Sequence, residues 1–437
     1  MGKLGKGSAW RLALVVVAVI GLAGCAGPAA SPSAQLTAVP SVQGMLTANP
    51  SPTPTPTLAP TSSPTARPPL KFVATGSMHV AREYATATLL PNGKVLITGG
   101  MADFGLTRDF YASAELYDPA TGKFTKTGSM TVARTNHTAT LLADGRVLIA
   151  GGYGCADPRQ CSGVFVGDMK DLGSAELYDP KTGKFSSTGS VIGTFANGTG
   201  TLLADGRVLL AEGDGGPAEL YDAQSGKFVA TGKEIGFANA TAALLPNGKV
   251  LLTGQSVTRS ATTRFPLIGE IYDEASGKFT KVSFELPPGS TQSAQYNGQV
   301  VKPFSMTGPI TVLKDGRILL FQGGYLETYD PAAGSCVAAG FVSPGAQWEI
   351  PTATLLSDGR VLILGGGVKP DSNPENNEVI TNSAVLYDPS GGAHAIGSMK
   401  SARRYHTATL LSNGAVLIAG GQDAHGKPVA SAELFKP

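Results

Sequence analysis

The chain has 437 residues, with 34 Lys and Arg against 32 Asp and Glu, and no run of basic residues occurs along it. This balance excludes nucleic acid as an expected partner, because nucleic-acid binding requires a basic patch or stripe. Four cysteines are too few for a fold held together by disulfides, and the length favours several small layers of structure over one simple core.

Residues 1–24 have the features of an export signal. Basic residues at the start precede an unbroken apolar stretch, 12–24, that is too short to span a bilayer. The end of this stretch, Leu22-Ala23-Gly24-Cys25, resembles the lipobox of bacterial lipoproteins, which implies cleavage before Cys25 and a diacylglycerol thioether on its sulfur. The alternative is an ordinary signal peptide followed by a chance cysteine. We expect an exported protein that is lipid-anchored to the outer face of the cell membrane, or on the periplasmic side of the outer membrane in a Gram-negative cell.

Residues 25–70 are expected to form a disordered tether that begins with the lipidated cysteine. The segment consists mainly of Pro, Ser, Thr and Ala, with almost no charge and few large apolar residues. Such a composition cannot bury enough apolar surface to fold, and its prolines favour extended conformations. The globular part is therefore predicted to span residues 71–437.

One phrase recurs seven times in the globular part: an apolar run, a turn that ends in glycine, and a second apolar run. The first copy reads ATLLPNGKVLITGG from Ala87, and the turn glycines are Gly93, Gly145, Gly206, Gly248, Gly316, Gly359 and Gly414. A second phrase, ELYDPATGKF from Glu115 in the first unit, recurs after six of them. A repeat of about 50 residues is typical of propellers and related repeat folds.

Each unit is predicted to contain four strands, A to D, which in the first unit cover 87–90, 95–100, 114–118 and 123–128. Asn-Gly and Asp-Gly between strands A and B suit a tight hairpin, because both central residues need positive φ. Strand B is apolar on both sides, which indicates a sheet with both faces buried.

The double glycines, the downstream tyrosines and the G-K-F phrase, repeated in register, resemble the kelch family of β-propellers. This resemblance implies an all-β fold of seven blades, each with four antiparallel strands. The chain starts its globular part with strand D at Lys71 and stops after strand C at Glu433–Pro437, so these ends are expected to pair and close the ring. Glu212, Gln255 and Gln322 disturb the double glycine, and their units are expected to be less regular.

Cys155 and Cys161 lie in one long loop, and in an exported protein they are predicted to form a local disulfide. A metal site is the alternative, but two cysteines without a nearby histidine make a poor zinc signature. Cys336 and His394 stand where other units have the strand-D phenylalanine, so both are predicted to occupy packing positions.

The A–B and C–D turns are expected to share one face, and the longer, dissimilar B–C and D–A loops the other. Loops on a rigid scaffold are where binding residues concentrate. Arg82, Arg134 and Arg403 recur in one phrase and are predicted to be structural. The candidate ligand-binding residues just before a strand A are Tyr84, Asn136, His137, Asn239, Trp348, Glu349, Tyr405 and His406.

We expect a non-enzymatic, membrane-anchored binding module without a cofactor, whose loop-rich face takes a protein or a carbohydrate. The alternative is a copper radical oxidase, because Tyr405-His406 resembles a stretch of the galactose and glyoxal oxidase propellers, where a Tyr-His pair ligates copper. Tyr84 and His137 could complete that copper set. No cysteine stands where those oxidases crosslink one to a ligand tyrosine. A structural component of the cell envelope is a third interpretation.

Overall fold

The structure is a computed structural model that describes residues 70–155, 161–212, 216–256, 267–282, 284, 294–296, 299–301, 307–322, 324–342, 347–349, 351–369 and 378–437. All of these residues belong to one compact unit, Ala66–Pro437. The described residues form strands, turns and a single 3-10 turn, which confirms the predicted all-β class.

Seven four-stranded antiparallel sheets make up the unit in the described part of the chain, one for each repeat. Blade 1 contains β2 (Thr86–Leu89), β3 (Val95–Thr98), β6 (Ala114–Asp118) and β7 (Lys123–Lys126), and blade 2 contains β8 (Thr138–Leu141), β9 (Val147–Ala150), β13 (Ser174–Asp179) and β14 (Lys184–Ser190). Blade 3 contains β15 (Thr199–Leu202), β16 (Val208–Ala211), β17 (Pro217–Asp222) and β18 (Lys227–Lys233).

The remaining four blades follow the same order from the inner to the outer strand. Blade 4 contains β19 (Phe237–Leu244), β20 (Val250–Ser256), β21 (Leu267–Asp273) and β22 (Lys278–Val282), and blade 5 contains β25 (Thr307–Val312), β26 (Ile318–Gln322), β27 (Tyr325–Asp330) and β28 (Ser335–Phe341). Blade 6 contains β30 (Thr352–Leu355), β31 (Val361–Leu364), β34 (Ser383–Asp388) and β35 (Gly392–Ser398), and blade 7 contains β36 (Thr407–Leu410), β37 (Val416–Ala419), β38 (Ala432–Lys436) and β1 (Lys71–Ala74).

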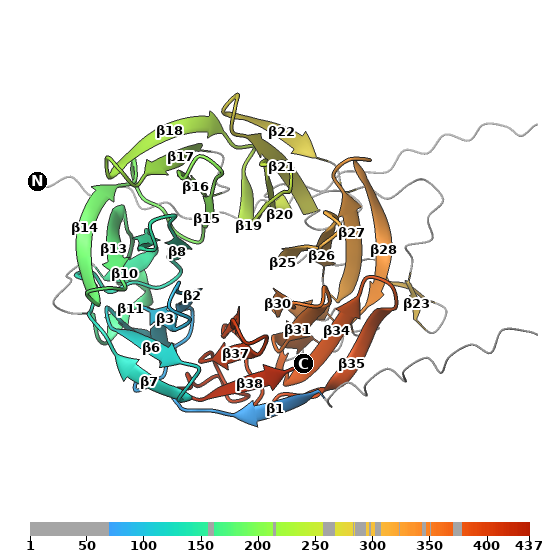
Figure 1. The fold of residues 1–437 in the computed structure, drawn as a ribbon. Helices are drawn as coiled ribbons and strands as arrows, with labels where there is room; N and C mark the ends of the chain where they lie inside the picture. Colours follow the sequence, from blue (N-terminus) through green and yellow to red (C-terminus); the bar gives the residue numbers. More distant parts are fainter. Residues whose placement is uncertain are drawn as a thin grey trace, which may run out of the picture. The chain divides into compact units, whose positions relative to one another are not determined.

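The blades are arranged around a common centre (Figure 1). Their innermost strands contact one another in the cyclic order β2, β8, β15, β19, β25, β30, β36 and back to β2. The ring closes in blade 7, where β1 pairs with β38 and Phe72 lies opposite Phe435, with their ring centroids 5.2 Å apart. This is the pairing of the two ends that the sequence predicted.

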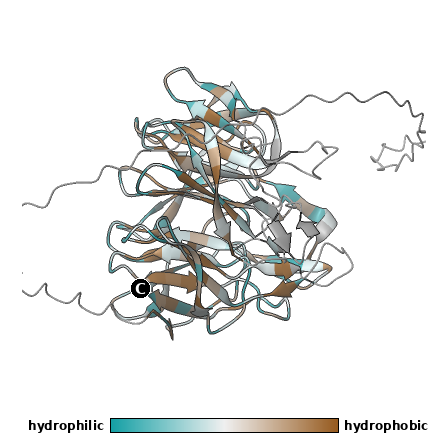
Figure 2. Cartoon of the chain, turned by 90° about the vertical axis from the view of Figure 1, so that its right-hand side faces the viewer, coloured by the Kyte–Doolittle hydropathy of each residue, from teal (hydrophilic) through white to brown (hydrophobic). Residues whose placement is uncertain are grey.

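The hydrophobic core lies between adjacent blades. Strand B is buried on both faces, as its unbroken apolar run predicts, and Val95, Leu96 and Ile97 are almost fully buried. One cluster joins Val95 and Tyr117 of blade 1 to Leu417 of blade 7. Apolar segments recur along the strands of successive blades (Figure 2).

In blades 1, 6 and 7 the double glycines lock the blade to the next one. The amide of Gly100 donates to the carbonyl of Arg134 at 2.9 Å, and Gly366 and Gly421 make the same bond to Arg403 and Arg82. A Cβ on Gly99, whose φ is +61°, would lie 2.4 Å from the Arg134 carbonyl oxygen and 2.7 Å from the His137 ring. Only glycine therefore allows this approach.

Blades 4 and 5 replace this lock with longer strands. β20 continues through Gln255 and pairs with both β19 and β21, and β26 ends at Gln322, which pairs with Thr307 and Tyr325. The register shifts between Ala238 and Thr241 and again between Thr307 and Ile310. The replacement of one glycine of the pair by glutamine thus accompanies bulged, extended hairpins.

Short accessory strands lie in the loops between the blade strands. Three of them, β4 (Met101–Asp103), β5 (Thr107–Phe110) and β11 (Val164–Phe165), form one sheet, and β10 (Tyr153–Cys155) pairs with β12 (Met169–Asp171) after the 3-10 turn η1 (Val166–Asp168). The others are β23 (Ala294–Tyr296) with β24 (Gln299–Val301), and β29 (Gln347–Glu349), β32 (Gly367–Lys369) and β33 (Val379–Ile380).

Candidate functional site

The connections between strands divide the ring into two faces. The A–B and C–D turns meet on one side, where Lys94 pairs with Asp118 at 3.2 Å, and we call this side the turn face. The B–C and D–A connections with the accessory strands lie on the other side, which we call the loop face. Tyr84 and Tyr405 come just before the inner strands β2 and β36, so they belong to the loop face near the centre of the ring.

Four residues at equivalent positions of consecutive blades form what we call the arc: Tyr405, Tyr84, Asn136 and Asn197. Each has a left-handed backbone with φ between 51° and 55°, and no other non-glycine residue of the described part has a positive φ. Their backbones are joined in sequence, because Tyr84 donates to the Tyr405 carbonyl, Asn136 to Tyr84 and Asn197 to Asn136. Asparagine tolerates this conformation, but tyrosine adopts it at a cost.

The side chains of the arc are also connected. The rings of Tyr84 and Tyr405 stack with centroids 4.0 Å apart, and the Arg404 guanidinium lies 4.7 Å from the Tyr405 centroid. The Asn136 amide donates to Asn197, which in turn donates to the Tyr153 hydroxyl at 2.7 Å. The arc thus offers aromatic, amide and phenol groups side by side.

Glu83 lies directly beside the arc and is fully buried, with an exposed fraction of 0%. One carboxylate oxygen, Oε1, accepts the Asp103 amide at 3.1 Å, whereas Oε2 has no hydrogen-bond partner. Burial, and secondarily the nearby Asp103 carboxylate, raises the pKa of Glu83 to about 7. Burial also raises the pKa of Tyr84, with a contribution from its hydrogen bond to Tyr405.

Replacement of Glu83 by Gln should make the protein more stable above pH 7 and leave it little changed below pH 4.5. The folded state of the wild type holds a proton on Glu83 that the unfolded state releases near pH 4.5, so the free energy of unfolding falls as pH rises from about 4.5 to about 7. The difference at pH 8 should reach roughly 3 kcal/mol at most. Urea denaturation at pH 5 and pH 8 measures the difference in the free energy of unfolding, with the exposed Asp171→Asn change as the control. An equal pH dependence of stability in the wild type and in Glu83→Gln would contradict the prediction.

His137 and His406 belong to the seams between blades and not to an open surface. Both are buried, and burial lowers the pKa of each to about 3. The Nε2 atom of His137 lies 3.0 Å from the Thr86 hydroxyl, and that of His406 lies 3.0 Å from the Thr352 hydroxyl. The prediction that these imidazoles contact a ligand is therefore corrected: they are neutral contacts between neighbouring blades.

The four residues suggested for copper do not fit a copper site. His137 faces blade 1 and His406 faces blade 6, so the two imidazoles point into different seams. Tyr84 and Tyr405 are stacked on each other, and the Tyr84 amide donates to the Tyr405 carbonyl. Among the described residues, no group of three or more His, Cys, Asp or Glu is placed to hold a metal ion.

Trp348 replaces a structural arginine and does not lie on the surface. The guanidinium groups of Arg82, Arg134 and Arg403 each donate to the carbonyl of the first glycine of the pair in their own blade. Trp348 is 1% exposed, and its indole N–H donates to Gly365 in the same way. The prediction of Trp348 as a contact residue is therefore wrong, because its spacing to the glycine pair makes it a scaffold residue.

The outcome for the other candidates differs from residue to residue. Asn136 belongs to the arc, whereas Asn239 in β19 and Glu349 in β29 have side chains outside the described set. Sequence reasoning missed Asn197, Glu83 and Arg404. Alignment of TFANGTGTLL (194–203) with RTNHTATLL (134–142) places Asn197 at the position of Asn136 and could have identified it. Glu83 and Arg404 could have been found as the residues directly before Tyr84 and Tyr405.

The structure joins Cys155 to Cys161 in a disulfide. Cys336 is buried opposite Tyr329, as expected of a packing residue, and burial raises the pKa of its thiol to about 12. The prediction for His394 is wrong. The C–D turn of blade 6 is shorter, so Ala393 takes the place opposite Tyr387 and His394 is exposed.

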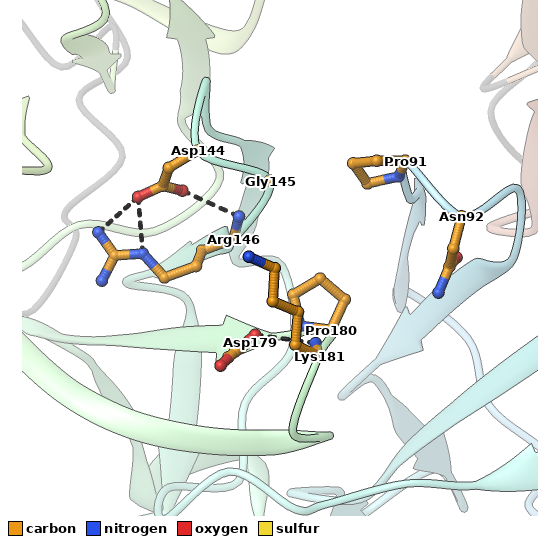
Figure 3. A pocket seen from close by; sticks show the side chains of 8 residues that line it. All are labelled: Pro91, Asn92, Asp144, Gly145, Arg146, Asp179, Pro180 and Lys181. Atoms are coloured by element: carbon orange, nitrogen blue, oxygen red, sulfur yellow. Dashed lines mark hydrogen bonds and ion pairs between the residues drawn. The ribbon is translucent and has the colours of Figure 1, made fainter.

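The turn face contains a pocket of about 540 Å³ between blades 1 and 2 (Figure 3). It is lined by Pro91, Asn92, Asp144, Gly145, Arg146, Asp179, Pro180 and Lys181. Arg146 is paired with Asp144 across the same turn, and the carboxylate of Asp179 accepts the Lys181 amide. An equivalent pocket of about 420 Å³ occurs between blades 5 and 6. These hollows are built by the recurring turns themselves.

Structural comparison identifies the fold. A fungal alcohol oxidase of the AA5 family, in complex with copper, aligns with a TM-score of 0.58 and 13% identity, over 84% of this chain and 76% of the oxidase. The structure of YjhT aligns with a TM-score of 0.48 and 13% identity, over 82% of this chain and 95% of that protein. No family model matches the sequence, and no curated protein is significantly similar.

The chain therefore has a β-propeller fold, which it shares with the alcohol oxidase. At this identity the likeness concerns the fold alone. The expectation that the protein is not an enzyme is nevertheless wrong as an inference from its fold, because a copper-containing alcohol oxidase shares that fold. In the described part of the chain, no helix is long and apolar enough to cross a membrane.

Proposed function

We propose that the protein is a membrane-anchored propeller that binds its ligand on the loop face, over the arc. The observation that carries this proposal is the row of four left-handed residues in consecutive blades, two of them tyrosines. A tyrosine in this conformation costs about 1 to 3 kcal/mol, and such strain persists mainly at functional sites. The strain supports a role for these side chains beyond holding the ring together.

The position of β1 supports a ligand site on the loop face. Lys71 pairs with Lys436 at the end of β38, which corresponds to the pairing of Lys123 with Asp118 at the C–D turn of blade 1. The chain thus enters the ring from the turn face. The proposed ligand site therefore lies on the face opposite to the start of β1.

Replacement of Cys25 by Ser should release the protein from the membrane into the periplasm or the medium. The proposal assigns the anchor to the lipid on the sulfur of this cysteine, and serine cannot form the thioether. Fractionation of cells that export the wild-type and variant proteins measures the effect, with Cys336→Ser as the control. If the same share of Cys25→Ser and wild-type protein were found in the membrane fraction, the lipid on Cys25 would not be the anchor.

A photo-crosslinking residue at position 197 should capture the ligand in intact cells, whereas the same residue at position 92 on the turn face should not. Asn197 is exposed at the end of the arc, and Asn92 is exposed in the first A–B turn. Mass spectrometry then identifies the captured species. Tyr405→Ala should reduce the yield at position 197 at least fivefold. Capture from position 92 alone would reverse the assignment of the faces.

A further inference from the structure

Three large apolar side chains project from the accessory sheet over blades 1 and 2, and we call them the apolar tip. Phe104 is 62% exposed, Leu106 is 79% exposed and Phe165 is 60% exposed. Phe104 and Leu106 occupy the turn of the β4–β5 hairpin, and Phe165 lies beside it because its partner in β5 is Thr107. Adjacent exposed groups of this size mark an interaction surface more often than a single exposed residue does.

The apolar tip stands on a rigid base. The Phe104 amide closes the turn on the Thr107 carbonyl, and Arg108 holds the Asp103 carboxylate at 3.0 Å. Asp109 accepts hydrogen bonds from the Ser162 hydroxyl and the Gly163 amide. The disulfide between Cys155 and Cys161 ties the neighbouring strand into the same base. These contacts hold the backbone that carries the three exposed side chains.

The base of the apolar tip is continuous with the arc. Its small core consists of Met101, Phe110, Ala133, Cys155 and Val164, and Tyr84 and Tyr153 pack against this core. Tyr153 also accepts the hydrogen bond from Asn197. The apolar tip and the arc therefore share one packed base.

Among the described residues, the charged groups around the tip are mainly acidic. Asp168 and Asp171 are exposed, Asp109 is half-buried, and Lys170 is the exposed cation between them. Arg108 does not offset them, because it is paired with Asp103 and its guanidinium also contacts the Met169 sulfur. A partner complementary to this surface has apolar side chains next to positive charges.

We propose that the apolar tip docks a polypeptide segment of apolar side chains flanked by Lys or Arg. This inference rests on the proposed function, since it names the class of ligand for the loop face. A phospholipid surface fits less well for two reasons. The carboxylates would face the negative surface of an anionic leaflet, and the first described strand, β1, begins at the opposite face of the ring.

Two labelled synthetic decapeptides with the same alternating Leu and Phe core test the proposal, one flanked by Lys and the other by Glu. Fluorescence anisotropy with the full chain should give a dissociation constant for the Lys-flanked peptide at least tenfold lower than for the Glu-flanked peptide. Phe104→Ser, Leu106→Ser and Phe165→Ser together should weaken the Lys-flanked peptide at least tenfold. The paired change Val229→Ser and Val337→Ser, at exposed apolar positions of outer strands, is the matched control.

A second variant keeps the test independent of the apolar changes. Asp168→Asn with Asp171→Asn should reduce the preference for the Lys-flanked peptide at least threefold. Equal binding of both peptides, or equal loss in the control, would overturn the proposal. The proposal would also be overturned if the triple serine variant of the tip changed only the sedimentation of the protein with phosphatidylcholine vesicles, or only its self-association. If position 197 captures a ligand but the tip changes do not affect peptide binding, this inference is refuted and the proposed function stands. If the tip changes weaken peptide binding but position 197 captures nothing, the proposed ligand site over the arc is refuted.

Discussion

Deletion of Lys71–Thr75 should destabilise the whole propeller by more than about 4 kcal/mol. The loss includes the β1–β38 ladder and the burial of Phe72, which packs with Phe435 in the core between blades 6 and 7. Full burial of a phenylalanine contributes about 1.5 to 3 kcal/mol, and the partly buried Phe72 supplies a share of this in addition to the lost ladder. The Thr75 hydroxyl also bonds the Tyr117 hydroxyl at 2.9 Å, so blade 1 loses a contact as well. Thermal and urea denaturation measure the effect.

The control for this experiment is a deletion of five residues, 51–55, from the segment before the ring. That change leaves β1 and its partners intact, and the melting temperature should equal that of the full chain. An unaltered melting temperature after the deletion of Lys71–Thr75 would show that β1 does not close the ring.

Replacement of Arg134 by Met should destabilise the protein by about 3 to 5 kcal/mol, because it leaves the buried Glu176 carboxylate without its cation. The guanidinium donates to the Gly151 and Ser174 carbonyls and to the Glu176 carboxylate at 3.3 Å. Both side chains are almost completely shielded from water. Urea denaturation of the purified variant measures the free energy of unfolding.

Blade 6 provides the matched comparison for this ion pair. There Trp348 stands in place of the arginine and Val385 in place of the glutamate, and both pack in one apolar cluster. Arg134→Met with Glu176→Leu should therefore cost at least 1 kcal/mol less than the sum of the two single changes. Additive single effects would show that the two side chains do not depend on each other.

The strands could be predicted because their information is local and repeated. Apolar runs, turn glycines and the recurring Tyr117-type position define hairpins within a few residues, and seven copies remove the ambiguity of any one. The ring closure could be predicted because the segment around Phe72 is a strand D without the rest of a blade, and the segment around Leu434 is a strand C without a strand D.

The site could not be predicted to the same depth, because it depends on contacts between blades. His137 and Tyr84 both precede a strand A, yet one is buried against Thr86 and the other is stacked on Tyr405. Trp348 seemed to be an isolated aromatic until its bond to Gly365 showed the equivalence with Arg403. One shorter turn was sufficient to move His394 from a packing position to the surface.

The direction of β1 determines how the ring carries mechanical load. A pull transmitted along the chain from its N-terminal side enters at Lys71, and a pull away from the turn face runs along the strand axis. Ladder hydrogen bonds are perpendicular to antiparallel strands, so this force shears the bonds between β1 and β38 together instead of opening them one at a time. The place where the two ends of the ring meet is held by non-covalent contacts alone, and it is thereby loaded in its most resistant direction.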